Sequence, residues 1–430
     1  MDPVPPPRGT HARSALPELP LYYALVGAYF FAFGMQFVLF PSLVAFVLHE
    51  GPTRVGLAQS ALSAPMFCFL LLGGLFAERA RPASALALLH LFFAAASIAL
   101  SVIVSANLLS YEVLIVYAVL VGSCAAFLMP TRDAALNGVV AREVDRGRNT
   151  SLATAAATTT AVQIGAQICG ILFARAAGAS PGPFLMAQAL TLLIAASLSL
   201  TLRAPKPSGH ERTISGAIRD VRDGLAYAFK NPVMAPMLIS AAYVGVFIIG
   251  SFQVLFPLII RDQYGGTAVE QAGRLAALFA SFWSASFVSA VVLSRTKPLE
   301  RPGRALIASH MVGAVALISL AFDKPFWVFT AIVLVWGLAA GVAISMSRTI
   351  TQGAASPQFL GRVLAVYSMG FMGGAPIGSA LVGVAAAQMG PQAAALIPGI
   401  GLAAAALLLA VTTPLWRFAP NAAVTPETFD

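Results

Sequence analysis

Long unbroken runs of apolar residues alternate along this chain with short polar breaks that often contain Gly or Pro. A run of about 20 apolar residues is long enough to cross a bilayer as an α-helix. A transmembrane β-strand would instead alternate apolar and polar residues at every second position, and these runs are continuous. The pattern predicts an all-α polytopic membrane protein with twelve transmembrane helices. The predicted spans are 21–48, 55–77, 84–106, 110–131, 150–176, 183–203, 232–260, 270–293, 304–322, 326–347, 361–388 and 392–413.

The longest internal connection, 204–231, divides these spans six and six. Within it, Ile214, Ile218, Leu225 and Phe229 fall at helical spacing with basic residues between them, which predicts an amphipathic helix lying along the membrane surface. The Pro-rich start lacks the apolar core of a signal peptide, so the first span is expected to direct insertion. The predicted domains are an N-terminal tail over 1–20, six-helix bundles over 21–203 and 232–413 with that linker between them, and a C-terminal tail over 414–430.

The composition agrees with a membrane protein. Of the 430 residues, 58% are hydrophobic and 10% are charged, too few charges to cover a soluble surface of this size. If both termini are cytoplasmic, all but five of the 26 Lys and Arg residues face the cytoplasm. The net charge of +9 then follows from topology and anionic lipid without nucleic acid. We expect a multi-pass protein of the plasma membrane, specifically the bacterial inner membrane. The five basic residues expected outside are Arg54, Arg175, Arg261, Arg274 and Lys324.

The two halves of the chain also match one another at an offset of 216 residues. The sequence VLFP occurs at 38–41 in the first span and again at 254–257 in the seventh. Arg132, at the end of span four, corresponds to Arg348 at the end of span ten. An ordered series of such matches predicts two pseudo-symmetric six-helix bundles with a substrate site between them near the bilayer midplane.

Three stretches resemble signature loops of the major facilitator superfamily. GLFAERAR, at 74–81, is similar to the superfamily's G-x-L-a-D-R-x-G-R loop, with Glu in place of Asp and without the second Gly. PTRDAALNGVV, from residue 130, and QGAASPQFLGRV, from residue 352, resemble loops of the exporter branch that includes macrolide-efflux and enterobactin-exporter-like proteins. The resemblance covers 21–413 and implies the major facilitator fold. The proton-antiport signatures that many drug antiporters of the superfamily carry on helices four and five are incomplete here, so the coupling ion stays open.

The resemblance also implies a charge latch at the cytoplasmic mouth. In the resembled fold, Glu78 would face the start of span eleven, and Arg79 or Arg81 would pair with Asp133 to lock the outward-open state. The alternative is that these are surface charges that set the topology. The predicted latch residues are Gly74, Glu78, Arg79, Arg81, Arg132, Asp133 and Arg362.

Neutral polar and aromatic side chains within the spans are the predicted substrate-binding residues. Gln36 and Gln253 precede the two VLFP sequences, on helices that line the cavity in the resembled fold, and an amide both donates and accepts hydrogen bonds. The alternatives are hydrogen bonds between helices for the amides and lipid contact for the aromatic rings. For His90 and His310, hydrogen bonding between helices is favoured over a proton relay. The predicted cavity residues are Gln36, Gln253, Tyr29, Phe33, Tyr243, Phe247, Gln163, Gln167 and Trp336.

These features favour a secondary active transporter that exports small amphipathic organic molecules, such as drug-like compounds, a siderophore or a metabolite, with proton antiport as one form of coupling. Uptake of a specific metabolite and lipid translocation are alternatives, and a non-transporting sensor is a remote one. The sequence has no G-x-x-x-x-G-K-[ST] loop and no converging catalytic cluster, so no enzyme and no cofactor are expected. Cys68, Cys124 and Cys169 share no metal-ligand spacing, and no metal is expected. The expected partners are the substrate, membrane lipids and, with antiport, protons, for a monomer that binds no nucleic acid.

Overall fold

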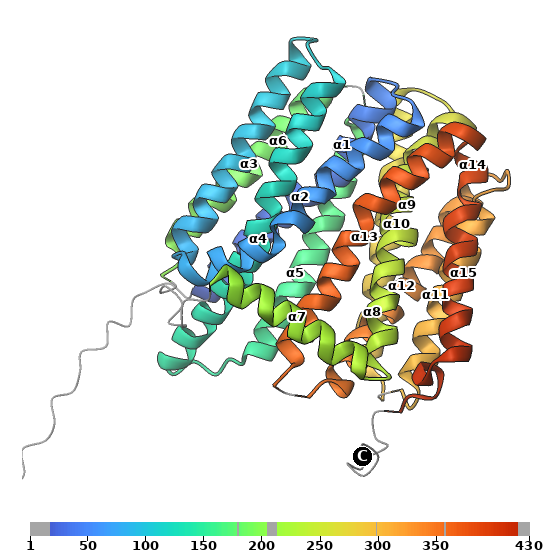
Figure 1. Cartoon of the computed structure of the whole chain (residues 1–430). Coiled ribbons are helices and arrows are strands. Elements are labelled where there is room, and N and C mark those ends of the chain that lie inside the picture. Colours follow the sequence, from blue (N-terminus) through green and yellow to red (C-terminus); the bar gives the residue numbers. More distant parts are fainter. Residues whose placement is uncertain (1–17, 179, 204–212, 298, 357, 420–430) are drawn as a thin grey trace, which may run out of the picture.

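The computed structural model describes residues 18–178, 180–203, 213–297, 299–356 and 358–419. Over these residues the chain forms two helical halves that stand side by side (Figure 1). Twelve helices are long and apolar enough to cross a membrane, which confirms the predicted twelve spans. The predicted tails and the start of the predicted linker lie largely outside the described residues.

Six spans make up the N half. They are α1 (Glu18–Ser42) continued by the π-helical turn η1 (Leu43–Val47), α2 (Pro52–Arg79), α3 (Pro82–Ser105), α4 (Tyr111–Asp145), α5 (Leu152–Phe173) continued by η2 (Ala174–Ala176), and α6 (Pro181–Thr201).

The C half has the same order of spans. Its first span consists of α8 (Met234–Val244), η3 (Gly245–Ile249), α9 (Gly250–Ile259) and η4 (Ile260–Tyr264). The next four spans are α10 (Ala268–Arg295), α11 (Pro302–Ser319), α12 (Phe326–Ala354) and α13 (Leu360–Met389). The last span consists of α14 (Pro391–Ala394) and α15 (Leu396–Thr412), and η5 (Pro414–Arg417) follows it. Each VLFP sequence precedes a π-helical turn, η1 in the N half and η4 in the C half, so the repeat is also visible in the backbone.

Local sequence signals set where these helices begin. Pro occupies the first position of α2, α3, α6 and α11, where its missing N–H costs nothing. The hydroxyls of Ser110 and Ser151 accept hydrogen bonds from the first turns of α4 and α5. Thr267 and Glu270 form a reciprocal capping box at the start of α10. The helix boundaries therefore follow from residues in the short polar breaks.

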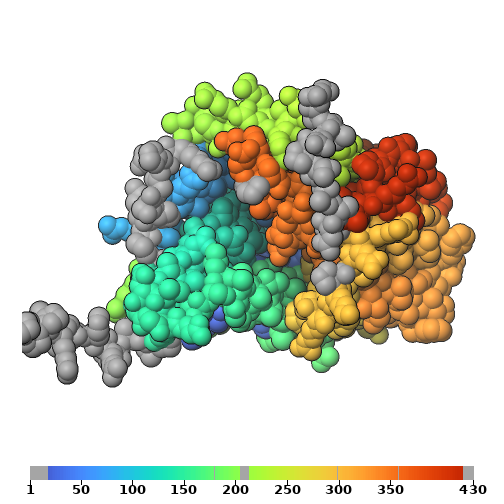
Figure 2. All heavy atoms as spheres, turned by 90° about the horizontal axis from the view of Figure 1, so that it is seen from below, coloured from blue at the N-terminus to red at the C-terminus, as the bar shows by residue number. Residues whose placement is uncertain are grey.

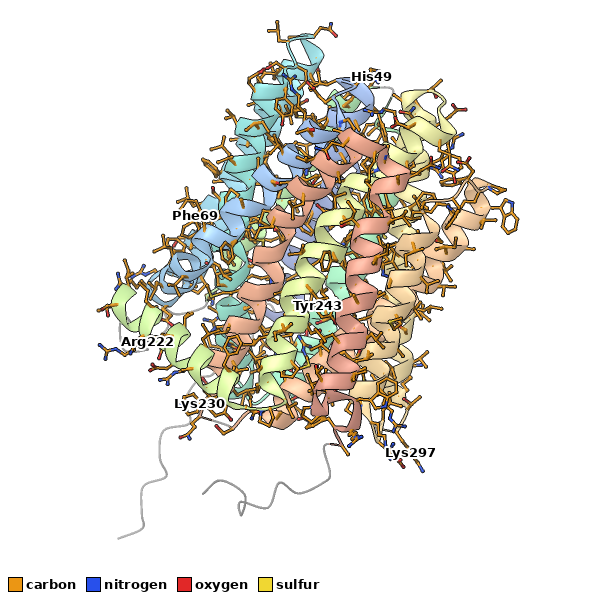
Figure 3. All side chains as sticks on the ribbon, turned by 45° about the vertical axis from the view of Figure 1, so that its right-hand side comes forward. His49, Phe69, Arg222, Lys230, Tyr243 and Lys297 are labelled. Atoms are coloured by element: carbon orange, nitrogen blue, oxygen red, sulfur yellow. The ribbon has the colours of Figure 1, made fainter. Side chains whose placement is uncertain are left out.

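The helix α7 (Ile214–Lys230) runs across one end of the bundle, which we call the α7 face (Figure 1). Arg222, Lys230 and Lys297 lie at this end, whereas His49 lies at the opposite end, which we call the far face (Figure 3). The predicted apolar residues of this helix are exposed, and the small residues Ala217, Gly224 and Ala228 are buried against the protein. The helix thus has a protein-facing side, an apolar side and a basic side.

The α7 helix is tied to the C half. The Asp220 carboxylate lies 2.9 Å from Nε of Arg362 in α13. The Tyr227 ring stacks on Phe359 with 4.4 Å between centroids, and the Tyr227 hydroxyl accepts a hydrogen bond from the Ser356 N–H. These contacts fix α7 to the segment that leads into α13.

The two halves meet closely near the far face. A Cβ atom placed on Gly56 of α2 would lie 2.5 Å from the carbonyl oxygen of Ser379 and 2.8 Å from Cα of Gly383, both in α13. Nη1 of Arg261 donates a hydrogen bond to the Glu50 carbonyl oxygen at 2.6 Å, across the same boundary. Small residues here let the two backbones approach, as is usual where membrane helices pack closely.

The opposite side of α13 packs equally closely within the C half. A Cβ on Gly378 would lie 2.0 Å from the Val246 carbonyl oxygen, and the Ser379 hydroxyl donates to the Gly250 carbonyl oxygen at 3.1 Å. One helix therefore carries close contacts to both halves.

At the α7 face, α7 contacts α2, but other parts of the two halves leave a hollow between them. Seen from this face, the space-filling surface is hollowed between the teal helices α4 and α5 and the orange segments of the C half (Figure 2). The molecule is closed at the far face and hollow at the α7 face.

Candidate functional site

Aromatic rings of α1 and α10 connect the two halves. The Phe37 ring of α1 lies 5.6 Å from the Phe279 ring and 6.0 Å from the Trp283 ring of α10, both edge to face. Phe33, one turn before Phe37, lies 5.3 Å from it. Of these four residues the sequence predicted only Phe33. The others carry no signal in an apolar run, because identifying them requires knowing which side of α1 faces α10.

Gln36 lies inside the N half. Its side-chain oxygen accepts hydrogen bonds from the Tyr117 hydroxyl of α4 and from Nε2 of Gln188 of α6, both at 2.9 Å, and the residue is 5% exposed. Nε2 of Gln188 also donates to the Ala32 carbonyl oxygen at 3.1 Å. In this conformation Gln36 makes the helix-to-helix hydrogen bonds that were its alternative assignment. Its symmetry mate, Gln253 of α9, is only partly buried.

The other predicted aromatic residues lie largely within one half. Tyr29 is buried against Phe30, Phe33 and the ring of His90. Trp336 is buried in the C half. A Cβ on Gly401 of α15 would lie 2.8 Å from the ring of Phe247, which places this ring against α15.

The two buried histidines bond across helices, as predicted. Nδ1 of His90 lies 3.2 Å from the Ser199 hydroxyl of α6. Nδ1 of His310 lies 2.7 Å from the hydroxyl of Tyr243, another predicted cavity residue, which Figure 3 shows within the C half.

One of the two predicted residues of α5, Gln163, contacts Arg132. Oε1 of Gln163 lies 3.4 Å from Nη1 of Arg132. Gln167, one turn further along α5, is buried, and its Nε2 has no hydrogen-bond partner within the described part of the chain. Arg132 is 8% exposed, and its guanidinium lies 5.1 Å from the centroid of the Phe30 ring in α1. Arg132, predicted for the latch, thus points into the N half, between α1, α4 and α5.

The remaining latch residues lie toward the α7 face on α2, α4 and α13 and at the start of α3. Gly74, Glu78 and Arg79 are in the last turns of α2, and Arg81 is exposed at the start of α3. Gly73 packs on the Ala126 carbonyl oxygen, and α2 and α4 run in the same direction, so Arg79 lies at about the level of Arg132 and Asp133. The Asp133 carboxylate pairs with Arg132, and Arg362 pairs with α7.

A buried charge cluster at the α7 face was not predicted. Glu18 and Glu143 are 3% and 2% exposed. Glu18 pairs with Arg142 and, at 3.0 Å, with Arg146, while Glu143 pairs with Arg148 at 2.6 Å and accepts a hydrogen bond from the Glu18 N–H at 3.0 Å. The prediction ended span four near 131, but α4 continues to Asp145. These ion pairs explain the extension, since they stabilise a polar helical segment beyond the apolar run.

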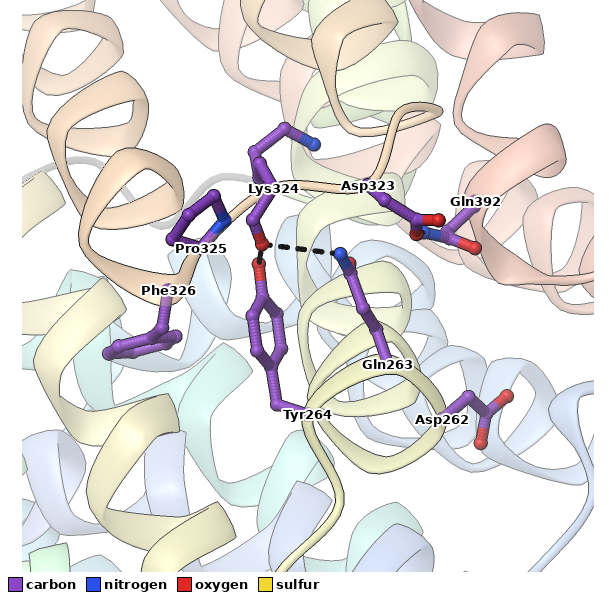
Figure 4. Close-up of a pocket in the computed structure, with 8 residues that line it drawn as sticks. All are labelled: Asp262, Gln263, Tyr264, Asp323, Lys324, Pro325, Phe326 and Gln392. Atoms are coloured by element: carbon purple, nitrogen blue, oxygen red, sulfur yellow. Dashed lines mark hydrogen bonds between the residues drawn. The ribbon is translucent and has the colours of Figure 1, made fainter.

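A polar depression of 740 Å³ lies apart from the hollow, where η4 meets the α11–α12 connection and α14 (Figure 4). The Tyr264 hydroxyl and the Gln263 amide donate to the Lys324 carbonyl oxygen at 2.9 and 3.3 Å, and the Gln392 amide donates to Asp323 at 2.7 Å. Burial lowers the pKa of the Lys324 ammonium, and the Asp323 carboxylate offsets part of that shift. The hydrogen bonds indicate that these residues hold the connections together.

Comparison with known proteins places these features in a family. A family model described as Major Facilitator Superfamily matches residues 24–369. The enterobactin exporter EntS of Citrobacter koseri is 24% identical over 383 residues, which cover 87% of this chain and 87% of that protein. The protein of the same name from Escherichia coli O1:K1 / APEC is 25% identical over 390 residues, covering 90% of this chain and 89% of that protein.

Solved structures support the same fold. The nucleoside transporter NupG has a TM-score of 0.68 at 14% identity, covering 94% of this chain and 100% of that one. A bacterial homolog to the human lysosomal transporter Spinster, in an inward-facing and unoccupied conformation, has a TM-score of 0.66 at 15% identity, covering 94% of this chain and 97% of that one. At these identities the likeness concerns the fold alone.

Proposed function

Because the chain belongs to the major facilitator superfamily and is therefore a multi-pass membrane transporter, we propose that it exports a small amphipathic organic molecule by alternating access. The observation that carries this proposal is the asymmetry between the two faces. The halves are in contact at the far face and hollowed apart at the α7 face. Alternating access requires a second state with the opposite asymmetry, reached by rocking one half against the other.

The direction rests on the chain's relatives and on charge. Two relatives that match most of this chain are named as enterobactin exporters. The excess of basic residues at the α7 face supports a cytoplasmic assignment for this face, and hence for both termini. With that orientation, the hollow receives substrate from the cytoplasm, as export from the bacterial inner membrane requires. The family and the solved neighbours are transporters, so we assign transport and no catalytic activity.

The latch is proposed to form when the α7 face closes. Asp133 and Arg79 lie at a similar level on adjacent helices, and the Asp133 side chain is 67% exposed, so it is accessible to a new partner. An ion pair from Asp133 to Arg79 or Arg81 would favour the outward-open state by a few kcal/mol at most. Gln163, Gln167, Gln253 and Phe33 remain the proposed cavity contacts, and protons the proposed coupling ion.

Accumulation in cells tests this function. Cells expressing wild-type, Asp133→Asn or Asp223→Asn protein would be loaded with enterobactin or with a panel of amphiphilic fluorescent dyes, with and without a protonophore. Asp223 is the matched control because it also pairs with the arginine that precedes it, on the surface helix α7. We expect wild type and Asp223→Asn to lower accumulation, and Asp133→Asn or the protonophore to abolish this effect. Unchanged accumulation in wild-type cells would exclude export of these compounds and favour metabolite uptake or lipid translocation.

A further inference from the structure

Arg132 is a buried cation well inside the N half. Its backbone lies at about the level of Arg79, and its guanidinium reaches the ring of Phe30 in α1 and the side chain of Gln163 near the middle of α5. Burying a guanidinium at this depth costs several kcal/mol unless it is paired, and charged residues in such places usually have a functional role. The position therefore calls for an anionic partner.

The anionic partner of Arg132 is the neighbouring residue Asp133, whose side chain is poorly buried. Oδ1 of Asp133 accepts hydrogen bonds from Nε at 3.1 Å and from Nη2 at 2.8 Å of Arg132. The Asp133 side chain is 67% exposed, whereas that of Arg132 is 10% exposed. An exposed carboxylate keeps most of its hydration, so it binds weakly and exchanges readily for another anion. The Nε–Nη2 edge of Arg132 is therefore held by a displaceable group at the boundary with solvent.

Two hydrogen-bond donors of Arg132 and of the facing helix α5 are poorly satisfied. Nη1 of Arg132 makes only a long hydrogen bond, at 3.4 Å, to Gln163. Nε2 of Gln167, which is buried one turn beyond Gln163 on α5, has no acceptor among the described residues. Such a combination suits a molecule that carries an anionic oxygen group, because a guanidinium binds carboxylate-like groups with two parallel hydrogen bonds.

We propose that Arg132 is the specificity-determining residue of the transport site, and that it recognises an anionic oxygen group on an organic substrate by taking it in place of Asp133. The inference rests on the proposed export function and names its substrate class. It also links binding to gating: an anion on Arg132 releases Asp133 at the level of Arg79, where the latch is proposed to form.

Binding of a matched pair of compounds tests the proposal. The full-length protein would be purified in detergent and titrated calorimetrically with naphthalene-2-sulfonate and with the uncharged naphthalene-2-sulfonamide. Wild type should bind the sulfonate at least about tenfold more tightly. Arg132→Gln should remove this preference. Asp133→Asn should tighten sulfonate binding by about two- to fivefold, since it removes the competing carboxylate. Asp223→Asn should behave as wild type.

Arg132→Gln and Asp133→Asn are expected to change sulfonate affinity in opposite directions. This separates recognition of the anion by Arg132 from a purely structural Arg132–Asp133 ion pair. If Arg132→Gln does not fold, Asp133→Asn alone decides, because a structural pair would give unchanged or weaker binding. Equal binding of both compounds by wild type, or binding of neither, overturns the proposal. Cellular export judges the proposed function separately. If wild type exports only uncharged or cationic dyes, export stands and anion recognition fails. If wild type binds the sulfonate selectively but exports no compound, anion recognition stands and the proposed export fails.

Discussion

Gly56→Val should shift the transporter away from the conformation described here. The added Cβ at position 56 would lie 2.5 Å from the Ser379 carbonyl oxygen and 2.8 Å from Cα of Gly383, and both neighbours are backbone atoms that cannot rotate away. Ordinary contact begins near 3.4 Å, so α2 and α13 must separate by about 1 Å. Overpacking of this kind costs about 1–3 kcal/mol. The same free energy changes the ratio of two conformations by about 5- to 150-fold.

The cost falls on the state with a closed far face, because α2 and α13 touch there across the two halves. A state in which the far face is open does not make this contact, so its population should rise. Gly165→Val is the matched control, since a Cβ on Gly165 would meet no described atom within 4 Å outside its own turn of α5. It introduces the same β-branched residue into the interior of a transmembrane helix, with the same intrinsic helix propensity.

Distances between spin labels would measure the shift. Labels at Leu108 and Phe322, two exposed residues in far-face connections of the N and C halves, would be placed in a background without the three cysteines. Gly56→Val should move the distance distribution toward longer values, while Gly165→Val should leave it as in the parent. A Gly56→Val protein that folds and keeps the parent distribution would refute the claim that this contact favours the closed far face.

Three further substitutions probe other features. Glu18→Gln should lower the free energy of unfolding by about 3 kcal/mol, measured as a lower melting temperature in detergent. Glu50→Gln removes a carboxylate from a more exposed pair and should change the free energy of unfolding by less than about 1 kcal/mol. Equal losses in the two variants would contradict the importance assigned to burial. Phe37→Ala should weaken the ring contact between the halves by about 1 kcal/mol and raise far-face opening in the spin-label assay, and an unchanged distribution would argue against that role. Tyr227→Ala should speed amide hydrogen exchange across α7, while Tyr227→Phe, which keeps the stacked ring, should change it much less. Similar exchange in both variants would assign the anchoring to the hydroxyl.

The spans and the repeat could be predicted from sequence because their signals are local. Continuous apolar runs fix the twelve helices, and the VLFP sequences mark equivalent points in both halves. The end of α4 could not be predicted this way. Its last turns are polar, and they are helical because Glu18, far away in the chain, pairs with Arg142 and Arg146.

The site was harder to predict because a helix that is apolar on all sides gives no information about its orientation. Gln36 and Gln253 occupy matching positions in the repeat, yet Gln36 bonds inside its half while Gln253 is partly exposed. Phe37 and Phe33 are equally apolar, and no sequence signal assigns the contacts with α10 to Phe37. Arg132 was placed correctly on α4, but the direction of its side chain depends on Phe30 and Gln163 in two other helices.

The double-sided packing of α13 limits how its sequence can evolve. Gly378 and Ser379 are held against the C half, and Gly383 against Gly56 of the N half, so two sides of one helix accept only very small residues. In a library of all single substitutions selected for transport, surviving variants of α13 should be depleted at these positions and abundant at Ile377 and Leu381, which are exposed. The order of tolerant and intolerant positions along α13 would then reveal its interface with the C half and its interface with α2 in one experiment. A relative that replaces Gly383 by a larger residue should carry a compensating change opposite it in α2.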